Sequence, residues 1–393
     1  MSYWSDKAIE KMECPNLGQL DTYVCSECVV DEALVDLVTA NLQENECSYC
    51  GKLDDSPCAA PFNVIMERIF SAISTCFSDA QDIDLPWVDG GWITEEVYRE
   101  EIIAEFDPGW DGPFVTDVIE CLDPSAYWTE HSNGDWAISN PSETLRYGWE
   151  GFKNQVLTRT RYLFLSEPED KSEFGRPDYL PISRMLDALG HLVNKHSLVR
   201  TFDPGAQSYF RVRVSTGTAN WSEPSDFGVP PQEKSSAGRM NPAGIPYFYV
   251  AMDEQTSIAE VIYNPVKYYV AMFQAILPVR LLDLTDLPTL PSLFLPELYD
   301  ERHELLFLRE FLDDITQPIV KDGREHVDYV PTQIVSEFFR HRYRGTDGEG
   351  IDGIMYPSVK NIGGTNIVIF ASSNDELSEL FQLVEFHESN NAL

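Results

Sequence analysis

Two Cys-x-x-Cys pairs near the start of the chain constrain its fold more than any other feature. They read Cys25-x2-Cys28-x18-Cys47-x2-Cys50 in a chain of 393 residues. Two short pairs at this separation can place four thiolates tetrahedrally around one zinc ion, and a closed four-sulfur site leaves no position for a catalytic water. Such binding contributes roughly 10–16 kcal/mol of folding free energy at neutral pH. The pattern therefore predicts a structural zinc-knuckle module over residues 1–58.

The remaining cysteines allow other interpretations of this region. Cys14 and Cys58 are substitute ligands for the same ion, whereas Cys76 and Cys121 fall on predicted helices and are expected in the core. The alternative for the paired cysteines is a set of unrelated buried thiols in a reducing compartment. A disulfide scaffold is not expected, because eight cysteines are too sparse for a chain of this length.

Residues 59–202 carry mostly helical patterns, and we expect a helical middle domain there. Apolar side chains recur at three- and four-residue steps from Phe62 to Phe77, which is typical of a helix that faces a core. Similar patterns predict helices at 94–106, 113–122, 142–165 and 180–198.

One pair in this domain suggests chemistry. Arg184 and His191 have the Arg-x6-His spacing of HEPN ribonucleases, in which the arginine holds a phosphate and the histidine assists proton transfer. The alternative is a surface arginine and an ordinary helix histidine, which we favour because the spacing is permissive and the surrounding charge is wrong for RNA.

After Asp203 the pattern changes to strands interleaved with helices, which predicts an α/β or α+β domain over residues 203–393. Strands are expected at 209–214, 247–252 and 366–370. Helices are expected at 331–341 and around 258–262, the latter capped by Asp253 or Thr256. The chain has neither of the usual glycine-rich nucleotide-binding loops.

The net negative charge of the chain disfavours some classes of binding partner. Lys and Arg total 28 against 65 Asp and Glu, so the formal net charge is −37. A surface this acidic repels phosphate backbones and anionic lipid, so neither nucleic acid nor membrane is the expected partner. The N-terminus has no signal-peptide pattern, and the longest apolar stretch, 268–279, is too short to span a bilayer. We therefore expect a soluble, cytoplasmic protein.

Four short stretches of the last domain combine residues that a catalytic site would need. They are 210–213, 238–241, 257–260 and 356–358. Glu260 is embedded among isoleucine, alanine and valine, and a carboxylate there is costly unless it is paired, so it is an ion-pair partner or functional. Ser358 alone is merely a loop serine. No histidine lies in these stretches to activate it, which disfavours a Ser-His-Asp hydrolase.

Residues 208–373 resemble the RES domain, which is named for an arginine, a glutamate and a serine. The matching runs are Tyr209-Phe-Arg-Val-Arg, Gly238-Arg-Met-Asn-Pro-Ala-Gly-Ile-Pro-Tyr-Phe-Tyr249, Thr256-Ser-Ile-Ala-Glu260, Tyr329-Val-Pro-Thr-Gln333, Gly353-Ile-Met-Tyr-Pro-Ser358 and Gly363-Gly-Thr-Asn366. The upstream region is similar to the zinc-knuckle and HEPN-like extension of some RES proteins. That resemblance is carried by Cys25-Ser-Glu-Cys28, Cys47-Ser-Tyr-Cys50-Gly and Trp149-Glu-Gly-Phe-Lys153.

The resemblance implies a fold akin to ADP-ribosyltransferases and a toxin that destroys NAD+ by hydrolysis or phosphorolysis. It assigns the catalytic residues as Arg211, Glu260 and Ser358, and it gives Arg239 and Tyr249 further positions in the pocket. Asn241 and Tyr356 are expected to bind substrate as well. We expect only one of Arg211 and Arg213 to face the pocket, since the two alternate along one strand.

The chemistry of NAD+ agrees with these roles. Cleavage of the nicotinamide–ribose bond develops positive charge on the sugar, which the Glu260 carboxylate would stabilise. Arg211 and Arg239 would grip the pyrophosphate, and Tyr249 would stack on or hydrogen-bond the nicotinamide riboside. Ser358 would orient a ribose or phosphate oxygen and need not act as a nucleophile.

Other functions stay open. They are ADP-ribosylation of a macromolecule, a HEPN-type ribonuclease, and a non-catalytic module that recruits a partner. The resemblance also leaves open an antitoxin or other regulatory partner, a homo-oligomer, a role in phage defence, and the choice between water and phosphate as acceptor. Two domains ahead of a complete catalytic unit suggest that the first 200 residues are regulatory.

Overall fold

The computed structural model describes residues 21–110, 112–163, 176, 178–215, 221–262, 267–318 and 325–390. Two compact units make up the fold. Unit 1 takes Met1–Thr144, Glu173–Tyr179 and Thr289–Leu306, and unit 2 takes Leu145–Ser172, Leu180–Pro288 and Phe307–Leu393. Each unit is therefore assembled from three separate segments of the chain.

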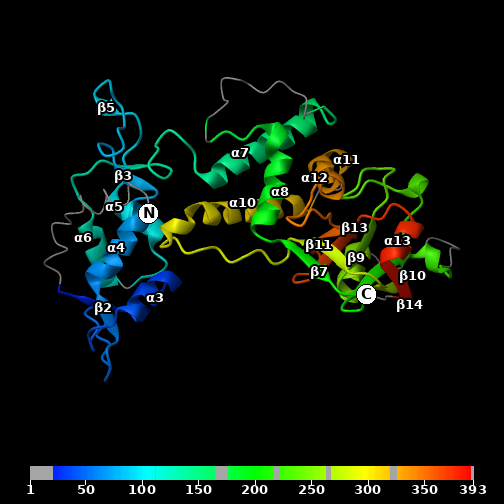
Figure 1. Ribbon diagram of the computed structural model, residues 1–393, viewed down its shortest axis with the longest axis horizontal. Coiled ribbons are helices and arrows are strands. Elements are labelled where there is room, and N and C mark those ends of the chain that lie inside the picture. Colours follow the sequence, from blue (N-terminus) through cyan, green and yellow to red (C-terminus); the bar gives the residue numbers. More distant parts are fainter. Residues whose placement is uncertain are drawn as a thin grey trace. The chain divides into compact units, whose positions relative to one another are not determined.

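Unit 1 is mainly helical with short strand pairs (Figure 1). Its elements are β1 (Tyr23–Cys25), α2 (Ser26–Val29), α3 (Glu32–Ala40), β2 (Ala59–Pro61), α4 (Phe62–Ile73), β3 (Phe77–Asp79), β4 (Trp87–Val88), β5 (Gly91–Trp92), α5 (Arg99–Phe106), α6 (Gly112–Cys121) and β6 (Trp128–Glu130). Strand β1 pairs with β2, β3 with β6, and β4 with β5, all antiparallel.

The apolar stripe predicted from Phe62 onward is confirmed as the buried face of α4. The helix ends at Ile73, however, and Phe77 opens strand β3 instead of continuing it. Cys76 is therefore not helical, contrary to the expectation. Cys121 ends α6 and is buried, as expected. The unit 1 core also includes Phe294, from the separate 289–306 segment.

Unit 2 is built on one mixed sheet of eight strands, in the order β14-β10-β8-β9-β13-β12-β11-β7. The strands are β7 (Val199–Phe202), β8 (Ser208–Val214), β9 (Phe248–Ala251), β10 (Lys267–Ala275), β11 (Val279–Asp283), β12 (Gly353–Pro357), β13 (Thr365–Ile369) and β14 (Phe381–Asn390). Only β11 and β12 pair in parallel; every other neighbouring pair in this sheet is antiparallel.

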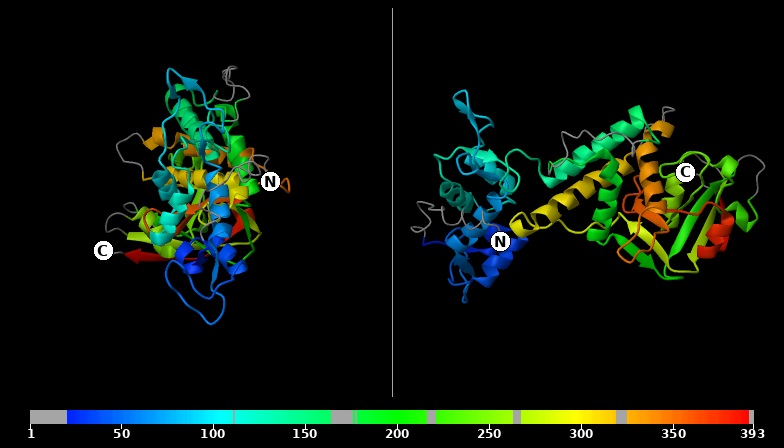
Figure 2. Two further views of the ribbon diagram at one scale, coloured as in Figure 1. Left: turned by 90° about the vertical axis from the view of Figure 1, so that its left-hand side faces the viewer. Right: turned by 45° about the horizontal axis from the view of Figure 1, so that its top comes forward.

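The helices of unit 2 are seen in Figure 1 and in the second view of Figure 2. They are α8 (Met185–Lys195), α9 (Glu254–Val261), α11 (Glu325–Asp328), α12 (Val330–His341) and α13 (Asn374–Leu380), with the π-helical turn Gln155–Arg159 after α7. Helices α7 (Pro141–Asn154) and α10 (Tyr299–Thr316) have residues in both units.

The predicted strands at 209–214, 247–252 and 366–370 and the two predicted helices are confirmed with small shifts of their ends. Asp253 is the cap of α9, since its Oδ1 accepts a hydrogen bond from the backbone N–H of Thr256 at 2.7 Å. Strands β7, β10, β11, β12 and β14 were not predicted as strands.

The two faces of the sheet carry different side chains, because successive residues of a strand point to opposite faces. On one face Tyr209 of β8 lies in a core with Phe248 and Phe273. On the other face Val212 packs with Ile258 and Ile262, at the C-terminal half of α9. This second face is the one that α9 covers.

Candidate active site and metal centre

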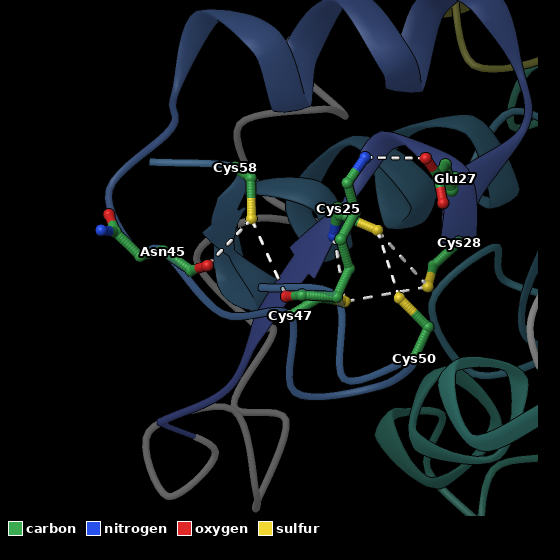
Figure 3. Close-up of polar contacts among 8 residues, drawn as sticks. Cys25, Glu27, Cys28, Asn45, Cys47, Cys50 and Cys58 are labelled. Atoms are coloured by element: carbon green, nitrogen blue, oxygen red, sulfur yellow. Dashed lines mark hydrogen bonds and ion pairs between the residues drawn. The ribbon is translucent and has the colours of Figure 1, made fainter. Parts of the chain in front are cut away.

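The four paired cysteines of unit 1 meet at one point (Figure 3). Their sulfur atoms all lie within 4.8 Å of one another. The Sγ atoms are 3.8 Å apart for Cys25 and Cys28, 3.5 Å for Cys25 and Cys50, and 3.8 Å for Cys28 and Cys47. Four sulfurs at ~2.3 Å from a tetrahedral zinc ion would be roughly 3.8 Å apart. The cluster therefore fits a four-sulfur site and could bind a metal ion.

Local structure brings the two pairs together. Cys25 ends strand β1, and Cys28 lies one turn later in α2. The second pair encloses a tight turn in which the N–H of Gly51 donates to the carbonyl of Cys47 at 3.0 Å. Gly51 has a φ of 70°, a left-handed conformation that costs glycine little. The backbone N–H of Cys25 also donates to Cys47 Sγ at 3.3 Å, which links the two knuckles.

The environment of these thiols suits a bound cation. Burial raises the pKa of Cys25 to about 11 and raises the pKa of Cys28 further. Burial also acts to raise the pKa of Cys47, but N–H donors from Cys50, Tyr49 and Cys25 outweigh it, so that the pKa is lowered. The Cys47 thiolate is thus favoured by the backbone alone, whereas Cys25 and Cys28 need nearby positive charge to ionise.

Of the two substitute ligands, Cys58 lies in the described part of the chain and is not among the clustered sulfurs. Cys58 directs its Sγ to the carbonyl oxygen of Asn45 at 3.2 Å, as Figure 3 shows. Cys14 lies outside the described residues.

A second cluster of polar groups surrounds Glu260 in unit 2. Glu260 lies near the end of α9, and its Oε1 accepts hydrogen bonds from Ser358 Oγ and from Asn366 Nδ2, each at 2.6 Å. Hydrogen bonds to a charged group are stronger than those between neutral groups. The carboxylate is therefore held in one orientation by residues from the ends of two neighbouring strands, β12 and β13.

The partners of the Ser358 hydroxyl determine in which of its hydrogen bonds it donates and in which it accepts. Its hydroxyl oxygen accepts from the backbone N–H groups of Lys360 at 3.2 Å and Asn361 at 3.1 Å. A hydroxyl has one proton, and here it is directed to Glu260. The Ser358 hydroxyl therefore donates its proton to the Glu260 carboxylate and accepts from two backbone N–H groups.

The loop after Ser358 is fastened to the first turn of α9. Asn361 Nδ2 donates to Thr256 Oγ1 at 2.7 Å, and Thr256 Oγ1 donates to Asp253 Oδ2 at 2.6 Å. A Cβ at Gly364 would lie only 2.1 Å from Thr256 Oγ1, so the close approach requires glycine. These contacts keep Ser358 and Glu260 together although 98 positions separate them in the chain.

The 238–241 loop carries Arg239 and Asn241, and helix α12 holds it. Thr332 Oγ1 donates to the carbonyl of Arg239 at 2.6 Å. Gln333 Nε2 donates to the carbonyls of Gly238 at 2.8 Å and Asn241 at 3.0 Å. Three carbonyl oxygens of one irregular loop are thereby satisfied by one helix, which gives the loop a single conformation.

Tyr249 and Asn241 contact each other inside this loop. The Tyr249 hydroxyl donates to Asn241 Oδ1 at 2.8 Å and accepts from the N–H of Met240 at 3.1 Å. Burial raises the pKa of Tyr249 well above its ordinary value. Asn241 is 4% exposed and donates to the carbonyl of Ile245 at 2.9 Å. Both polar ends of the Asn241 amide are thus used within the loop.

The charges of Arg239 and Glu260 both influence the pKa of the Tyr356 hydroxyl. Burial raises the pKa of Tyr356; the charge of Arg239 acts to lower it, and the charge of Glu260 to raise it. Arg239 directs its Nη1 to the carbonyl of Ile315 at 2.6 Å and lies 5.5 Å over the ring of Tyr329. Tyr356 therefore lies within reach of both charges.

Arg211 is placed differently. It alternates with Val212, so it shares the face of β8 that carries Tyr209 and lies opposite the face covered by α9. Its guanidinium lies 4.8 Å over the ring of Phe248, and its Nη1 is 3.3 Å from the carbonyl of Tyr249. Burial, and then the charge of Arg213, lower its pKa. The structure therefore does not bring Arg211 into the group around Glu260.

The expectation that Arg211 and Arg213 face opposite ways is wrong. Residues two apart in a strand point to the same face. The interstrand pairs Arg211–Ala271 and Arg213–Tyr269 confirm a regular register, and both partners belong to one core. Arg213 directs its Nη2 to the carbonyl of Gly228 at 3.1 Å.

Comparison with protein families matches most of the chain. The model of HEPN/RES N-terminal domain 1 matches residues 40–170, and that of the RES domain matches residues 209–385. The chain therefore contains a HEPN/RES N-terminal domain and a RES domain. No curated protein matches it. The expected architecture of an N-terminal HEPN/RES domain followed by a RES domain is therefore confirmed, and at family level the RES domain supports an NAD+-related toxin or effector.

Within the RES domain, the sequence did not identify three polar side chains that hydrogen-bond to the residues or loops of the candidate site. Asn366 was noted only as the end of the Gly363–Asn366 run, and Gln333 only as the end of the Tyr329–Gln333 run. The position of both side chains inside runs that match the family was the available signal. Asn361 lies outside those runs and gave no signal.

The Arg184 and His191 pair lies outside the matched HEPN/RES segment. Arg184 precedes α8 with 70% of its side chain exposed and lies 3.9 Å from Asp187, and His191 is also exposed. Of the described helices, none has the length and apolar character needed to cross a membrane.

Proposed function

We propose that the RES domain cleaves the nicotinamide–ribose bond of NAD+ and that the Glu260 carboxylate stabilises the positive charge that develops on the ribose. The observation that carries this proposal is the pair of 2.6 Å hydrogen bonds from Ser358 and Asn366 to Glu260 Oε1. A carboxylate held before substrate arrives needs no reorganisation in the transition state.

Arg239 is the arginine that we assign to the pyrophosphate. It is near enough to Tyr356 to act on its pKa, as Glu260 also does. A guanidinium suits the diphosphate because its N–H groups form a planar fork. Arg211 we assign a positioning role, since its contact with the Tyr249 carbonyl supports strand β9 from the opposite face.

The remaining pocket residues have narrower proposed roles. Tyr356 is 7% exposed and would line the sugar site through its ring. Tyr249 would orient the 238–241 loop through its bond to Asn241 and present its ring to the nicotinamide riboside. Asn241 would bind substrate only through the loop that it shapes.

We further propose zinc as the ion held by Cys25, Cys28, Cys47 and Cys50, with a structural role. An ADP-ribosyltransferase-like fold for residues 203–393, a knuckle over 1–58 and a helical HEPN-like domain over 59–202 belong to the same proposal. In this view the protein is a cytoplasmic toxin or effector whose N-terminal region restrains the enzyme. An antitoxin or a second copy would contribute to that restraint.

The test is NAD+ turnover by the purified full chain. Glu260→Gln should abolish nicotinamide release, because the amide has the same shape but no charge. Glu254→Gln, on the same helix and with an exposed side chain, is the matched control and should keep full activity. Turnover that requires phosphate would identify a phosphorylase, turnover without it a hydrolase, and labelling of a macromolecule a transferase.

The same assay distinguishes the proposed roles of Arg239 and Arg211. Arg239→Lys should raise KM, whereas Arg211→Lys should lower stability together with activity. Equal activity of the wild type and Glu260→Gln would disprove the proposed mechanism.

A further inference from the structure

The β4–β5 hairpin of unit 1 extends away from the helices of that unit, as the views of Figures 1 and 2 show. Trp87 pairs with Trp92 and Val88 with Gly91. The turn residues Asp89 and Gly90 have φ angles of 53° and 89°. Two consecutive left-handed residues, with the sequence Asp-Gly, are typical of a type I′ turn, which sets the register of a two-residue hairpin. The hairpin therefore has one defined shape.

Large apolar side chains are exposed on this hairpin. The exposed fractions are 60% for Trp87, 54% for Val88 and 46% for Ile93. The rings of Trp87 and Trp92 meet edge to face with centroids 5.0 Å apart. Contiguous exposed apolar surface commonly marks an interaction site, and tryptophan is the residue most enriched among binding hot spots.

The base of the hairpin is firmly attached within unit 1. The Tyr127 hydroxyl donates to the carbonyl of Thr94 at 2.9 Å, and Thr94 and Thr129 share a hydroxyl–hydroxyl bond of 2.6 Å. The ring of Trp92 lies 6.1 Å from that of Tyr127. An isolated two-stranded hairpin is marginally stable, so these contacts supply its rigidity. A rigid aromatic tip loses little conformational entropy when it binds.

The charge around the tip indicates the partner. Asp84, Asp89, Glu95 and Glu96 are exposed, and no lysine or arginine occurs between Arg68 and Arg99. The whole chain has a net charge of −37, so a second copy, a nucleic acid and an anionic lipid surface are all disfavoured by like charge. A cationic segment is the complementary partner.

We propose that the β4–β5 hairpin is a docking site for a basic segment of another protein. Lysine or arginine side chains of that segment stack on the rings of Trp87 and Trp92, because tryptophan gives the strongest cation–π attraction among aromatic residues. The surrounding carboxylates steer the segment and pair with its charges. This site is independent of the NAD+ chemistry proposed for unit 2.

The test uses the full chain and a fluorescent peptide of alternating arginine and leucine, with a glutamate–leucine peptide of equal length as the comparison. Fluorescence anisotropy should detect binding of the basic peptide alone. Trp87→Ala should weaken it at least about tenfold, as expected for a tryptophan hot spot. Tyr162→Ala, which removes a 90% exposed aromatic ring in unit 2, is the matched control and should leave binding unchanged.

A second variant addresses charge without disturbing the turn. Asp89→Asn keeps the residue type that type I′ turns favour, so the hairpin should persist while the affinity and its salt dependence both decrease. Unchanged affinity in Trp87→Ala would overturn the proposal, as would equal binding of the acidic peptide. A dimer in sedimentation that Trp87→Ala dissociates would assign the hairpin to a second copy, and loss of binding to neutral phosphatidylcholine vesicles in the same variant would assign it to lipid. Either result would also overturn the proposal.

Discussion

Asn366 offers the sharpest test of how the carboxylate is held. Its Nδ2 donates to Glu260 Oε1 at 2.6 Å, and the residue is 8% exposed. A hydrogen bond to a charged group contributes about 1.5–3 kcal/mol. Since about 1.4 kcal/mol corresponds to a factor of ten in rate, Asn366→Ala should lower kcat/KM by about 10- to 150-fold. The loss should fall mainly on kcat, because the bond orients the group that we assign to the transition state.

The assay is nicotinamide release over a range of NAD+ concentrations. Asn194→Ala is the matched control, since Asn194 accepts from the Tyr343 hydroxyl at 2.6 Å and donates to the Arg344 carbonyl at 3.1 Å within the same unit. It should lose stability without losing activity per folded molecule. In a Glu260→Gln background, Asn366→Ala should add little, because the two residues act as one unit. Activity within twofold of wild type in folded Asn366→Ala would refute this account of the site.

Two further predictions concern unit 1. Cys47→Ser should remove the bound metal ion and lower the melting temperature of the unit, whereas Cys58→Ser should keep about one ion per chain in metal analysis; equal metal content in the two variants would contradict the four-sulfur site. Burial lowers the pKa of His131 from 6.5 to about 4, so between these pH values the unfolded chain takes up a proton that folded unit 1 does not. The free energy of unfolding should therefore decrease as the pH falls through this range, by up to ~1.4 kcal/mol for each pH unit. The ring should be neutral with its proton on Nε2, because Gly134 N–H donates to Nδ1 at 2.9 Å. Denaturant unfolding at several pH values between 7 and 4 measures this dependence. The free energy of unfolding should vary less with pH in His131→Gln than in the wild type, and an identical pH dependence would exclude this histidine as the cause.

Local patterns predicted much of the RES domain. The alternation at 209–214 and the capped helix at 254–261 are short-range features, and each is confirmed as β8 and α9. The four cysteines were also predictable, because two residues between the members of each pair bring both sulfurs to one side of a turn. In these places the nearest neighbours in the chain decide the geometry.

Strand β10 shows where this reasoning stops. Its sequence is apolar on both faces, so periodicity alone does not separate a central strand from a buried helix segment. Strand β14 has the opposite difficulty, because its exposed edge position leaves a mixed polar sequence. Strand β14 pairs with β10 alone in this sheet, whereas β10 lies between β14 and β8, so pairing with neighbours makes both of them strands.

The amino-acid sequence by itself determined the metal-site spacing and the residue types at the candidate site, and it limited the α9 cap to Asp253 or Thr256. The tertiary structure decided which of those residues meet. Asn366 reaches Glu260 because β13 lies beside β12, and Arg211 points away from α9 because strand alternation places it on the other face. The physical reason is that a strand's own sequence sets its alternation, whereas its neighbours and the helix that covers it are chosen by burial over the whole sheet.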